Sequence, residues 1–305
     1  MRRDSRVDAA VSELLQVADE IRAALDDGRP VVALETTLVA HGFPAPRGVA
    51  VGLASEAAIR EAGAIPATIG VLDGRIRVGL EREELEWFTP EARKLGARDL
   101  AASAVAGTVG ATTVGGVLAV ARIVGIRFLG TGGIGGVHRG YPAPPDVSAD
   151  LLGLVACPVL VVCSGVKSIL DVPATVEFLE TLGIPVVGFR TDTLPLFYAA
   201  TGGPSVPHRV EDAEAAARIA AAHWQLGGCG LLLASPPPES LEVEGLIEEA
   251  VAEAARQGVS GQAVTPFVLA FLHERSGGHT LDVNEALIVA NARLAAEVAV
   301  AYAAL

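Results

Sequence analysis

Short apolar runs recur along the chain, and amphipathic stretches separate them. The runs are VVAL at 31–34, ATIGVL at 67–72, RIRVGL at 75–80, IRFLG at 126–130, PVLVVCS at 158–164, IPVVGF at 184–189 and GLLLAS at 230–235. The last four are continuous apolar stretches without strict alternation, which is typical of strands buried on both faces of a sheet. Asp73-Gly74 lies between the second and third runs and predicts a two-residue hairpin turn.

Helical spacing of apolar residues fills the intervals between these runs. The opening stretch, 7–26, predicts an amphipathic helix, and further helices are expected over 48–62, 111–124, 148–156, 171–182, 211–226 and 240–257. From Thr265 onward the chain is expected to be purely helical, with Asp282 as the N-cap of the last helix. Strands that alternate with helices predict a largely parallel sheet covered on both faces.

We therefore expect an α/β fold, namely an α/β/α sandwich with a mostly parallel sheet and a helical C-terminal segment. No linker or repeat divides the 305 residues, so one domain is expected over 1–305, with an N-terminal helix within 1–27 and C-terminal helices over 265–305. A net charge of −13 without a basic cluster argues against a nucleic-acid partner. The longest apolar run is too short to span a membrane and no signal peptide is evident, so a cytoplasmic location is expected.

Polar residues follow several strand-like runs, where ligands gather in open α/β sheets. GTGGIG at 130–135 fits the spacing of a dinucleotide-binding loop, but no helical pattern follows it, which argues against that site. A glycine nest facing an anion, or a tight structural turn, are the remaining interpretations. Ser164 and Lys167 fit the SxxK motif of serine acyl-enzymes, but the segment around Lys94 reads KLG and does not supply the KTG segment that such enzymes need.

Three residues at these strand ends have chemistry of their own. Lys167 follows an apolar strand and is a candidate nucleophile for a sugar aldehyde, with an ion pair at the sheet edge as the alternative. Glu35 is a lone carboxyl directly after a strand, and partial burial would raise its pKa into the range of a general acid. A helix cap or an ion pair is the alternative for Glu35. Asp146 suits Mg²⁺ or Mn²⁺ held mainly by water, and a helix cap is its alternative.

Ordered motifs carry a resemblance to a known family. VALETTLVAHGFP, KLGARDL, GATTV, TGGIGGVHRG, DVSADL, SGVKSILD, GIPVVGF and TPFVLA occur in this order over about residues 28–303. Together they closely resemble the pseudouridine-5′-phosphate glycosidase family. The resemblance implies reversible cleavage of pseudouridine 5′-phosphate to uracil and ribose 5-phosphate. It also implies a divalent metal, usually Mn²⁺, and an α/β/α fold that assembles as a homotrimer.

The resemblance also implies roles for individual residues. Lys167 would form a Schiff base with C1 of the opened ribose, Glu35 would donate the proton, Lys94 would contact the substrate and Asp146 would hold the metal. Further substrate-site positions are Val114, His138, Ser148, Ala149, Asp150 and Asn291, to which we add Thr131 as a phosphate contact. A C-glycosidic bond has no leaving oxygen to protonate, so the paired-carboxylate route of ordinary glycosidases is not open. An iminium at C1 supplies an electron sink instead.

Departures from the family pattern leave two alternatives. Pro145 stands where an aromatic residue usually precedes the metal aspartate, Ser235 stands where asparagine is usual, and KLGARDL departs from the usual KVSxRDL. These changes bear on the acceptor base, so C-ribosylation of an aromatic polyketide by ribose 5-phosphate is the alternative reaction. A sugar-phosphate sensor without catalysis is the alternative outside enzymes. Of the 23 basic residues only two are lysines, and both lie in the matched motifs.

Overall fold

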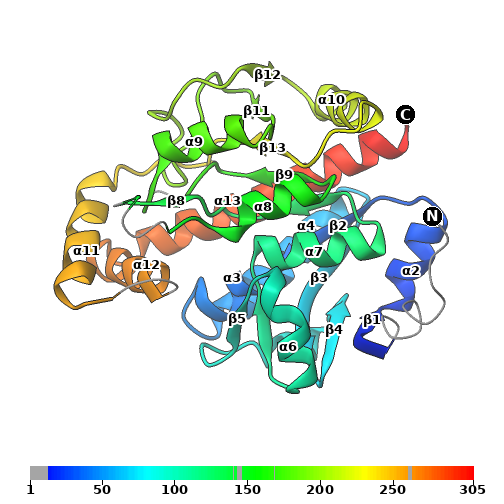
Figure 1. Ribbon diagram of the computed structural model, residues 1–305, viewed down its shortest axis with the longest axis horizontal. Helices are drawn as coiled ribbons and strands as arrows, with labels where there is room; N and C mark the ends of the chain where they lie inside the picture. Colours follow the sequence, from blue (N-terminus) through cyan, green and yellow to red (C-terminus); the bar gives the residue numbers. More distant parts are fainter. Residues whose placement is uncertain (1–12, 140, 143–145, 168, 260–262) are drawn as a thin grey trace.

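A long, mostly parallel β-sheet forms the centre of the fold (Figure 1). The computed structural model describes residues 13–139, 141, 142, 146–167, 169–259 and 263–305. The described strands of this sheet are β1 (Leu15–Val17), β2 (Val31–Glu35), β3 (Ile65–Leu72), β4 (Arg75–Val78), β5 (Arg93–Leu95), β6 (Gly110–Thr112), β7 (Phe128–Gly130), β9 (Leu160–Cys163), β11 (Val186–Phe189), β12 (His208–Val210) and β13 (Leu231–Ala234). A separate antiparallel pair joins β8 (Val137–His138) to β10 (Leu170–Asp171).

Helices cover both faces of the sheet (Figure 1). Those before β7 are α2 (Asp19–Asp26), α3 (Thr37–His41), α4 (Arg47–Glu61), α5 (Arg82–Leu85), the 3₁₀ turn η1 (Ala97–Asp99), α6 (Leu100–Val105) and α7 (Val114–Val124). Those after it are α8 (Ala149–Ala156), α9 (Val172–Thr181), α10 (Ala213–Gln225), α11 (Glu244–Arg256), α12 (Val264–Arg275) and α13 (His279–Ala303). The α/β/α sandwich with a mostly parallel sheet and C-terminal helices is confirmed.

The strand order is β1-β4-β3-β2-β7-β9-β13-β11-β12, and the run from β3 through β12 is parallel. The carboxyl ends of these strands therefore meet along one edge. β3 also forms antiparallel pairs with β6 and, through a hairpin, with β4. In the hairpin turn, Asp73 and Gly74 have φ values of 51° and 75°. Both are left-handed, as a two-residue hairpin of the primed type requires, so the predicted turn is confirmed.

Alternate residues of each central strand enter two different cores. Val31 and Ala33 of β2 pack on the side of α7 and α8, whereas Val32 and Leu34 pack against α10 and α13. β9 and β13 show the same division. Because both faces are buried, neither face needs polar residues, and this explains the continuous apolar runs in the sequence.

The long helix α13 lies against β2, β7 and β9 and against helices α4 and α10. By length and composition, α13 is the helix within the described residues that could cross a membrane, but half of its most apolar window is buried inside the protein. Gly130 lets it approach β7 closely, because a Cβ there would lie 2.8 Å from the Cα of Ala292. α13 is thus a core helix of this fold.

Three local predictions are wrong in part. The helix expected over 7–26 is replaced by β1 and α2 in its described part, because Leu15–Val17 pairs with β4 at the sheet edge. Of the helix expected over 111–124, the start belongs to β6, which pairs with β3 and β5, and α7 begins at Val114. Asp282 is not the N-cap of α13, since the helix already begins at His279 and the Asp282 carboxylate accepts a hydrogen bond from Arg47 at 2.6 Å.

We expect Gly130→Ala to lower the free energy of unfolding by about 2 kcal/mol, because the new methyl group must displace the backbone of α13 from β7. Chemical denaturation measures the loss. Gly245→Ala in α11 is the matched control, since a Cβ there meets nothing within 4 Å. The control is expected to be neutral or stabilising. Equal effects of the two substitutions would contradict the close contact between α13 and β7.

Candidate active site

Three neighbouring strands bring the central site residues to one edge of the sheet. Glu35 is the last residue of β2, Thr131 follows β7 directly, and Lys167 follows β9 through Ser164 and Gly165. β2 pairs with β7 and β7 pairs with β9 in parallel register. The backbone N–H of Thr131 continues this ladder by donating to Val162 O at 3.0 Å. The strand-end prediction of the site is therefore supported by the topology.

Glu35 is a buried acid whose side chain accepts a hydrogen bond from Thr131. It is 5% exposed, and the hydroxyl of Thr131 donates to its Oε1 at 2.5 Å. Burial raises the pKa of Glu35, while the charges of Lys167 and Lys94 and the Thr131 hydrogen bond oppose the increase. The raised pKa agrees in direction with the expectation for a general acid.

Two lysines, Lys94 and Lys167, lie close enough to Glu35 for their charges to act on it. Lys94 is on β5, whereas the backbone N–H of Lys167 donates to Ile134 O in the glycine-rich loop at 3.2 Å. The pKa of Lys94 is lowered, first by burial and then by the positive charge of Lys167. Both lysine side chains are half-buried. The arrangement brings two amines and one carboxyl into electrostatic contact.

The glycine-rich loop, residues 131–136, is held from α13. Asn291 of α13 is 1% exposed, and its Nδ2 donates to Thr131 O at 2.9 Å and to Ser164 Oγ at 3.1 Å. Thr131 was expected to contact the phosphate. In the structure it is fully buried, and its hydroxyl donates to Glu35. Among the described residues the loop contains no helix, in agreement with the rejection of a dinucleotide-binding loop.

The start of α8 meets the start of α7 beside the same loop. Ser148 is the N-cap of α8, and its Oγ accepts from the backbone N–H of Asp150 at 3.2 Å. The Asp150 carboxylate accepts from Gly115 N at 2.7 Å and from Gly135 N at 2.9 Å. Val114, the first residue of α7, is buried, and Ala149 is exposed. A Cβ on Gly115 would lie 3.4 Å from the backbone of Ala149, so the expected substrate-site residues on α7 and α8 are adjacent.

His138 and Asp146 form the polar pair on the other side of the site. Their side chains lie 3.8 Å apart, measured from Nδ1 to Oδ2, and the backbone of His138 donates to Asp146 O at 2.9 Å. The pKa of His138 is lowered by burial, with opposition from Asp146 and further lowering by Lys94 and Lys167. Within the described ranges no three His, Cys, Asp or Glu side chains form a metal-binding group. A metal at Asp146 would thus take most of its ligands from water and substrate.

Phe197 and Tyr198 were not predicted from the sequence but contact the central segment. Phe197 N donates to Ser164 O at 2.9 Å, and a Cβ on Gly133 would meet the Phe197 ring at 2.6 Å. Phe197 has a φ of 64°, which is costly for a residue with a side chain. Tyr198 and Lys167 line one small cavity of about 20 Å³. The sequence feature that could have pointed to them is that two aromatic residues are consecutive in a chain with only 4% aromatics.

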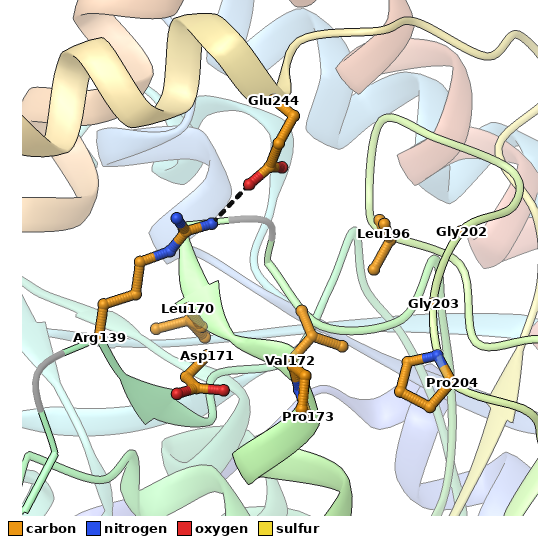
Figure 2. A pocket seen from close by; sticks show the side chains of 10 residues that line it. All are labelled: Arg139, Leu170, Asp171, Val172, Pro173, Leu196, Gly202, Gly203, Pro204 and Glu244. Carbon is orange, nitrogen blue, oxygen red and sulfur yellow. Dashed lines mark hydrogen bonds and ion pairs between the residues drawn. The ribbon is translucent and has the colours of Figure 1, made fainter.

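A larger pocket of about 350 Å³ lies nearby, beyond β10 (Figure 2). The Arg139 side chain extends across it to Glu244 of α11 and donates to Glu244 Oε1 at 2.9 Å. Its other lining residues are Leu170, Asp171, Val172, Pro173, Leu196, Gly202, Gly203 and Pro204. None of the predicted site residues lines this pocket, so it is separate from the cluster around Glu35.

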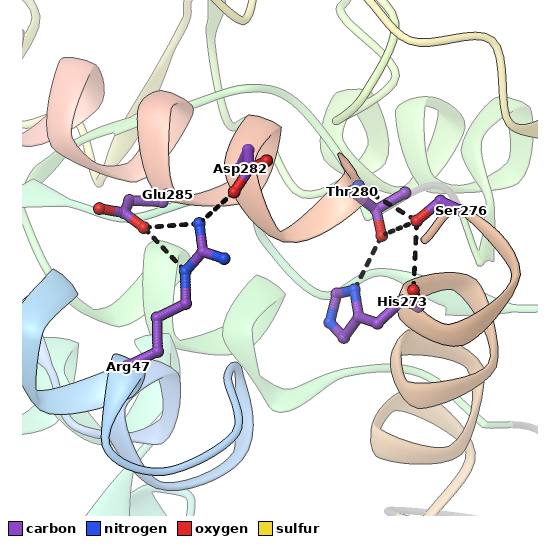
Figure 3. Close-up of polar contacts among 6 residues, drawn as sticks. All are labelled: Arg47, His273, Ser276, Thr280, Asp282 and Glu285. Carbon is purple, nitrogen blue, oxygen red and sulfur yellow. Dashed lines mark hydrogen bonds and ion pairs between the residues drawn. The ribbon is translucent and has the colours of Figure 1, made fainter. Parts of the chain in front are cut away.

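Polar contacts join α13 to the start of α4, and others join the end of α12 to the start of α13 (Figure 3). Arg47, at the start of α4, donates to Asp282 at 2.6 Å and to Glu285 at 2.9 Å, both on α13. His273 of α12 pairs through Nδ1 with the Thr280 hydroxyl at 2.8 Å. Burial lowers the pKa of His273 to about 4. The Arg47 pairs therefore attach α13 to α4.

We expect Glu35→Gln to raise the free energy of unfolding by about 1 kcal/mol at neutral pH. A group whose pKa is raised in the folded state destabilises the fold increasingly as pH rises above its unfolded value, and glutamine removes that cost while still accepting from Thr131. The gain should therefore grow from pH 4 upward, as thermal unfolding across pH measures. Glu297→Gln, on the exposed face of α13, is the control. A gain independent of pH would contradict the raised pKa.

The sequence profile of the family described as indigoidine synthase A like protein matches residues 20–301. A pseudouridine-5′-phosphate glycosidase of Herpetosiphon aurantiacus is 48% identical over 295 residues, which cover 94% of this chain and 97% of that protein. One of Myxococcus xanthus is 46% identical over 298 residues, which cover 95% and 98%.

Two solved structures share the fold. The prealnumycin C-glycosynthase AlnA, in complex with ribulose 5-phosphate, has a TM-score of 0.86 and 41% identity, with 95% of this chain and 97% of that one covered. An indigoidine synthase A-like protein from Thermotoga maritima has a TM-score of 0.84 and 39% identity, with 94% and 96% covered. This chain is therefore an enzyme that belongs to the pseudouridine-5′-phosphate glycosidase family.

Proposed function

We propose that this enzyme cleaves pseudouridine 5′-phosphate reversibly to uracil and ribose 5-phosphate through a Schiff base on Lys167. The buried acid Glu35 beside the two lysines carries the proposal, because cleavage of a carbon–carbon bond needs a nucleophilic amine and a proton donor in one place. The names of the relatives from Herpetosiphon and Myxococcus support the substrate.

The amine of Lys167 attacks C1, the ring C1–O4 bond breaks, and the proton lost by the amine goes to O4. The C1–C5 bond between sugar and base then breaks. Its electron pair stays on C5 of uracil, which takes the Glu35 proton, and C1 becomes an iminium with Lys167. Water hydrolyses this iminium to the ribose 5-phosphate aldehyde and the free amine, and the proton released returns to the Glu35 carboxylate. Lys94 supplies positive charge for the phosphate, and Lys94 and His138 supply hydrogen-bond donors.

Asp146 is the residue that would hold Mn²⁺, or another divalent cation such as Mg²⁺. Among the residues that the structure describes, Asp146 belongs to no group of three His, Cys, Asp or Glu side chains, and this fits an ion that retains water and takes substrate oxygens as ligands. When bound, the ion supplies positive charge for the anionic substrate.

Asp146→Asn is expected to raise the Mn²⁺ concentration for half-maximal activity by roughly tenfold or more.

A second candidate function is attachment of ribose 5-phosphate to an aromatic polyketide. The similarity to AlnA, a prealnumycin C-glycosynthase solved with ribulose 5-phosphate, favours it. Incubation of the enzyme with ribose 5-phosphate and either uracil or a hydroxynaphthoquinone distinguishes the two reactions. Formation of pseudouridine 5′-phosphate supports the first function, and a C-ribosylated quinone alone supports the second.

Three expectations accompany the proposal and stay predictions. They are one domain over 1–305, a cytoplasmic location and a homotrimer. Sedimentation equilibrium of the purified enzyme measures the oligomeric state, and a mass other than three chains would contradict the trimer.

We expect sodium borohydride to trap a covalent adduct of ribose 5-phosphate on Lys167. Lys167→Arg should abolish both the adduct and turnover, because arginine stays protonated and forms no imine. Lys94→Arg is the matched control, since it replaces the other lysine and keeps the nucleophile, so its adduct should persist with weaker affinity. Intact mass and peptide mapping locate the adduct. An adduct on Lys94, or none on the wild type, would overturn the Schiff-base mechanism.

A further inference from the structure

Phe197 is at the centre of a strained three-residue turn. Its φ is 64°, and the backbone N–H of Tyr198 donates across it to Leu196 O at 2.7 Å. A hydrogen bond between residues i and i+2 around a positive φ is characteristic of the strained form of the γ-turn, which is rare. A residue with a bulky side chain adopts such a backbone only where its surroundings impose it, and this kind of strain is concentrated at functional sites.

The segment that leads to Lys167 holds this turn in place. Ser164 O accepts a hydrogen bond from the backbone N–H of Phe197 at 2.9 Å. Gly165 fits against the turn only as a glycine, because a Cβ there would lie 1.9 Å from Pro195 O. The strained turn and the segment between β9 and Lys167 are therefore packed together as one unit.

The turn places the Phe197 ring against the glycine-rich loop and beside Lys167. One edge of the ring faces the loop, where a Cβ on Gly133 would meet it at 2.6 Å and a Cβ on Gly132 at 3.3 Å. The same ring and Lys167 border one cavity of about 20 Å³. The ring thus lies next to both the proposed nucleophile and the loop that begins with the partner of Glu35.

The cavity beside the ring forms a rigid wall for one side of Lys167. Ile247 of α11 and Leu272 of α12 line it, and both are fully buried. Tyr198 also lines it and packs edge-to-face on Phe197, with ring centroids 4.8 Å apart. Side chains packed this closely have little freedom to move, so the wall restricts the rotamers that Lys167 can adopt.

We propose that Phe197 is a positioning residue: its ring, held by the strained turn, fixes the side chain of Lys167 relative to the glycine-rich loop for attack on C1 of the sugar. The inference rests on the proposed function of Lys167 as nucleophile. A shift of about 1 Å in a reacting group can cost about a hundredfold in rate. Because Lys94 and His138 are assigned to the phosphate, we expect Phe197 to act on the rate of attack and not on binding of the sugar.

The test is Phe197→Leu in the full-length enzyme, mixed with ribose 5-phosphate and quenched with sodium borohydride after a series of times. At saturating sugar, we expect the rate of adduct formation on Lys167 to fall by roughly tenfold or more. The sugar concentration that gives the half-maximal rate should stay within about threefold of the wild-type value. Adduct formation at the wild-type rate, or a change confined to the half-maximal concentration, would overturn the proposal.

Phe128→Leu is the matched control. Phe128 is 4% exposed and Phe197 is 5% exposed, but the Phe128 ring packs against Trp224 of α10 and Tyr302 at the end of α13. The same substitution should therefore lower the free energy of unfolding and leave the rate of adduct formation unchanged. An equal loss of rate in the two variants would assign the effect to a general loss of packing and reject a positioning role.

A second pair of variants tests the strain, and it also serves if Phe197→Leu does not fold. Phe197→Gly relieves the left-handed backbone, whereas Phe197→Ala keeps it, and both remove the ring. We expect the glycine variant to be the more stable of the two in chemical denaturation, and both to form the adduct slowly. A glycine variant that is no more stable would contradict the strain. A wild-type rate in either variant would contradict the positioning role.

The wild type separates failure of this inference from failure of the proposed function. An adduct on Lys167 that forms quickly in the wild type and slowly in Phe197→Leu supports the inference. An adduct that forms equally quickly in both overturns the inference and leaves the proposed function intact. Absence of an adduct in the wild type means that the proposed function itself has failed.

Discussion

The contact of α13 with β7 determines where the site residues lie. Gly130 has no side chain, so α13 packs on β7 at a depth that a Cβ would prevent. At that depth Asn291 reaches Thr131 O at 2.9 Å and Ser164 Oγ at 3.1 Å. Thr131 in turn donates to Glu35. The position of the acid on an early strand therefore depends on a helix near the end of the chain, and the hydrophobic packing of that helix is what holds the polar contacts together.

Burial of Glu35 near Lys94, Lys167 and Asp150 lowers the free energy of unfolding. Each charge loses hydration, and the opposing charges repay only part of that loss. The environment raises the pKa of Glu35 and lowers that of Lys94, so proton affinities that differ widely in water are brought closer together. Such convergence is characteristic of sites that transfer protons. Proton transfer would therefore explain why these charged groups are buried together, whereas their effect on stability would not.

Sequence reasoning succeeded where local pattern decides the structure. Continuous apolar runs predicted the central strands, and the positions of Glu35 and Lys167 directly after such runs predicted where they meet. It failed where a distant partner decides. Leu15–Val17 has helical periodicity but pairs with β4, and Asp282 binds Arg47 instead of capping α13. The contacts of Asn291 and Asp150 join residues far apart in the chain, and the left-handed backbone of Phe197 has no local signal, so periodicity could not show them.

Lysine and arginine differ in the interactions that they form among the described residues of this protein. The ion pairs formed by described residues all use arginine or histidine as the cation, as in the pairs of Arg47 with α13 and of Arg60 with Glu20. Neither Lys94 nor Lys167 takes part in them. Arginine suits structural pairs because its planar group stays protonated and binds carboxylates with two donors. A reaction that needs a free amine cannot use it. The proposed Schiff base needs such an amine, and Lys167, which follows β9, can supply it where arginine could not.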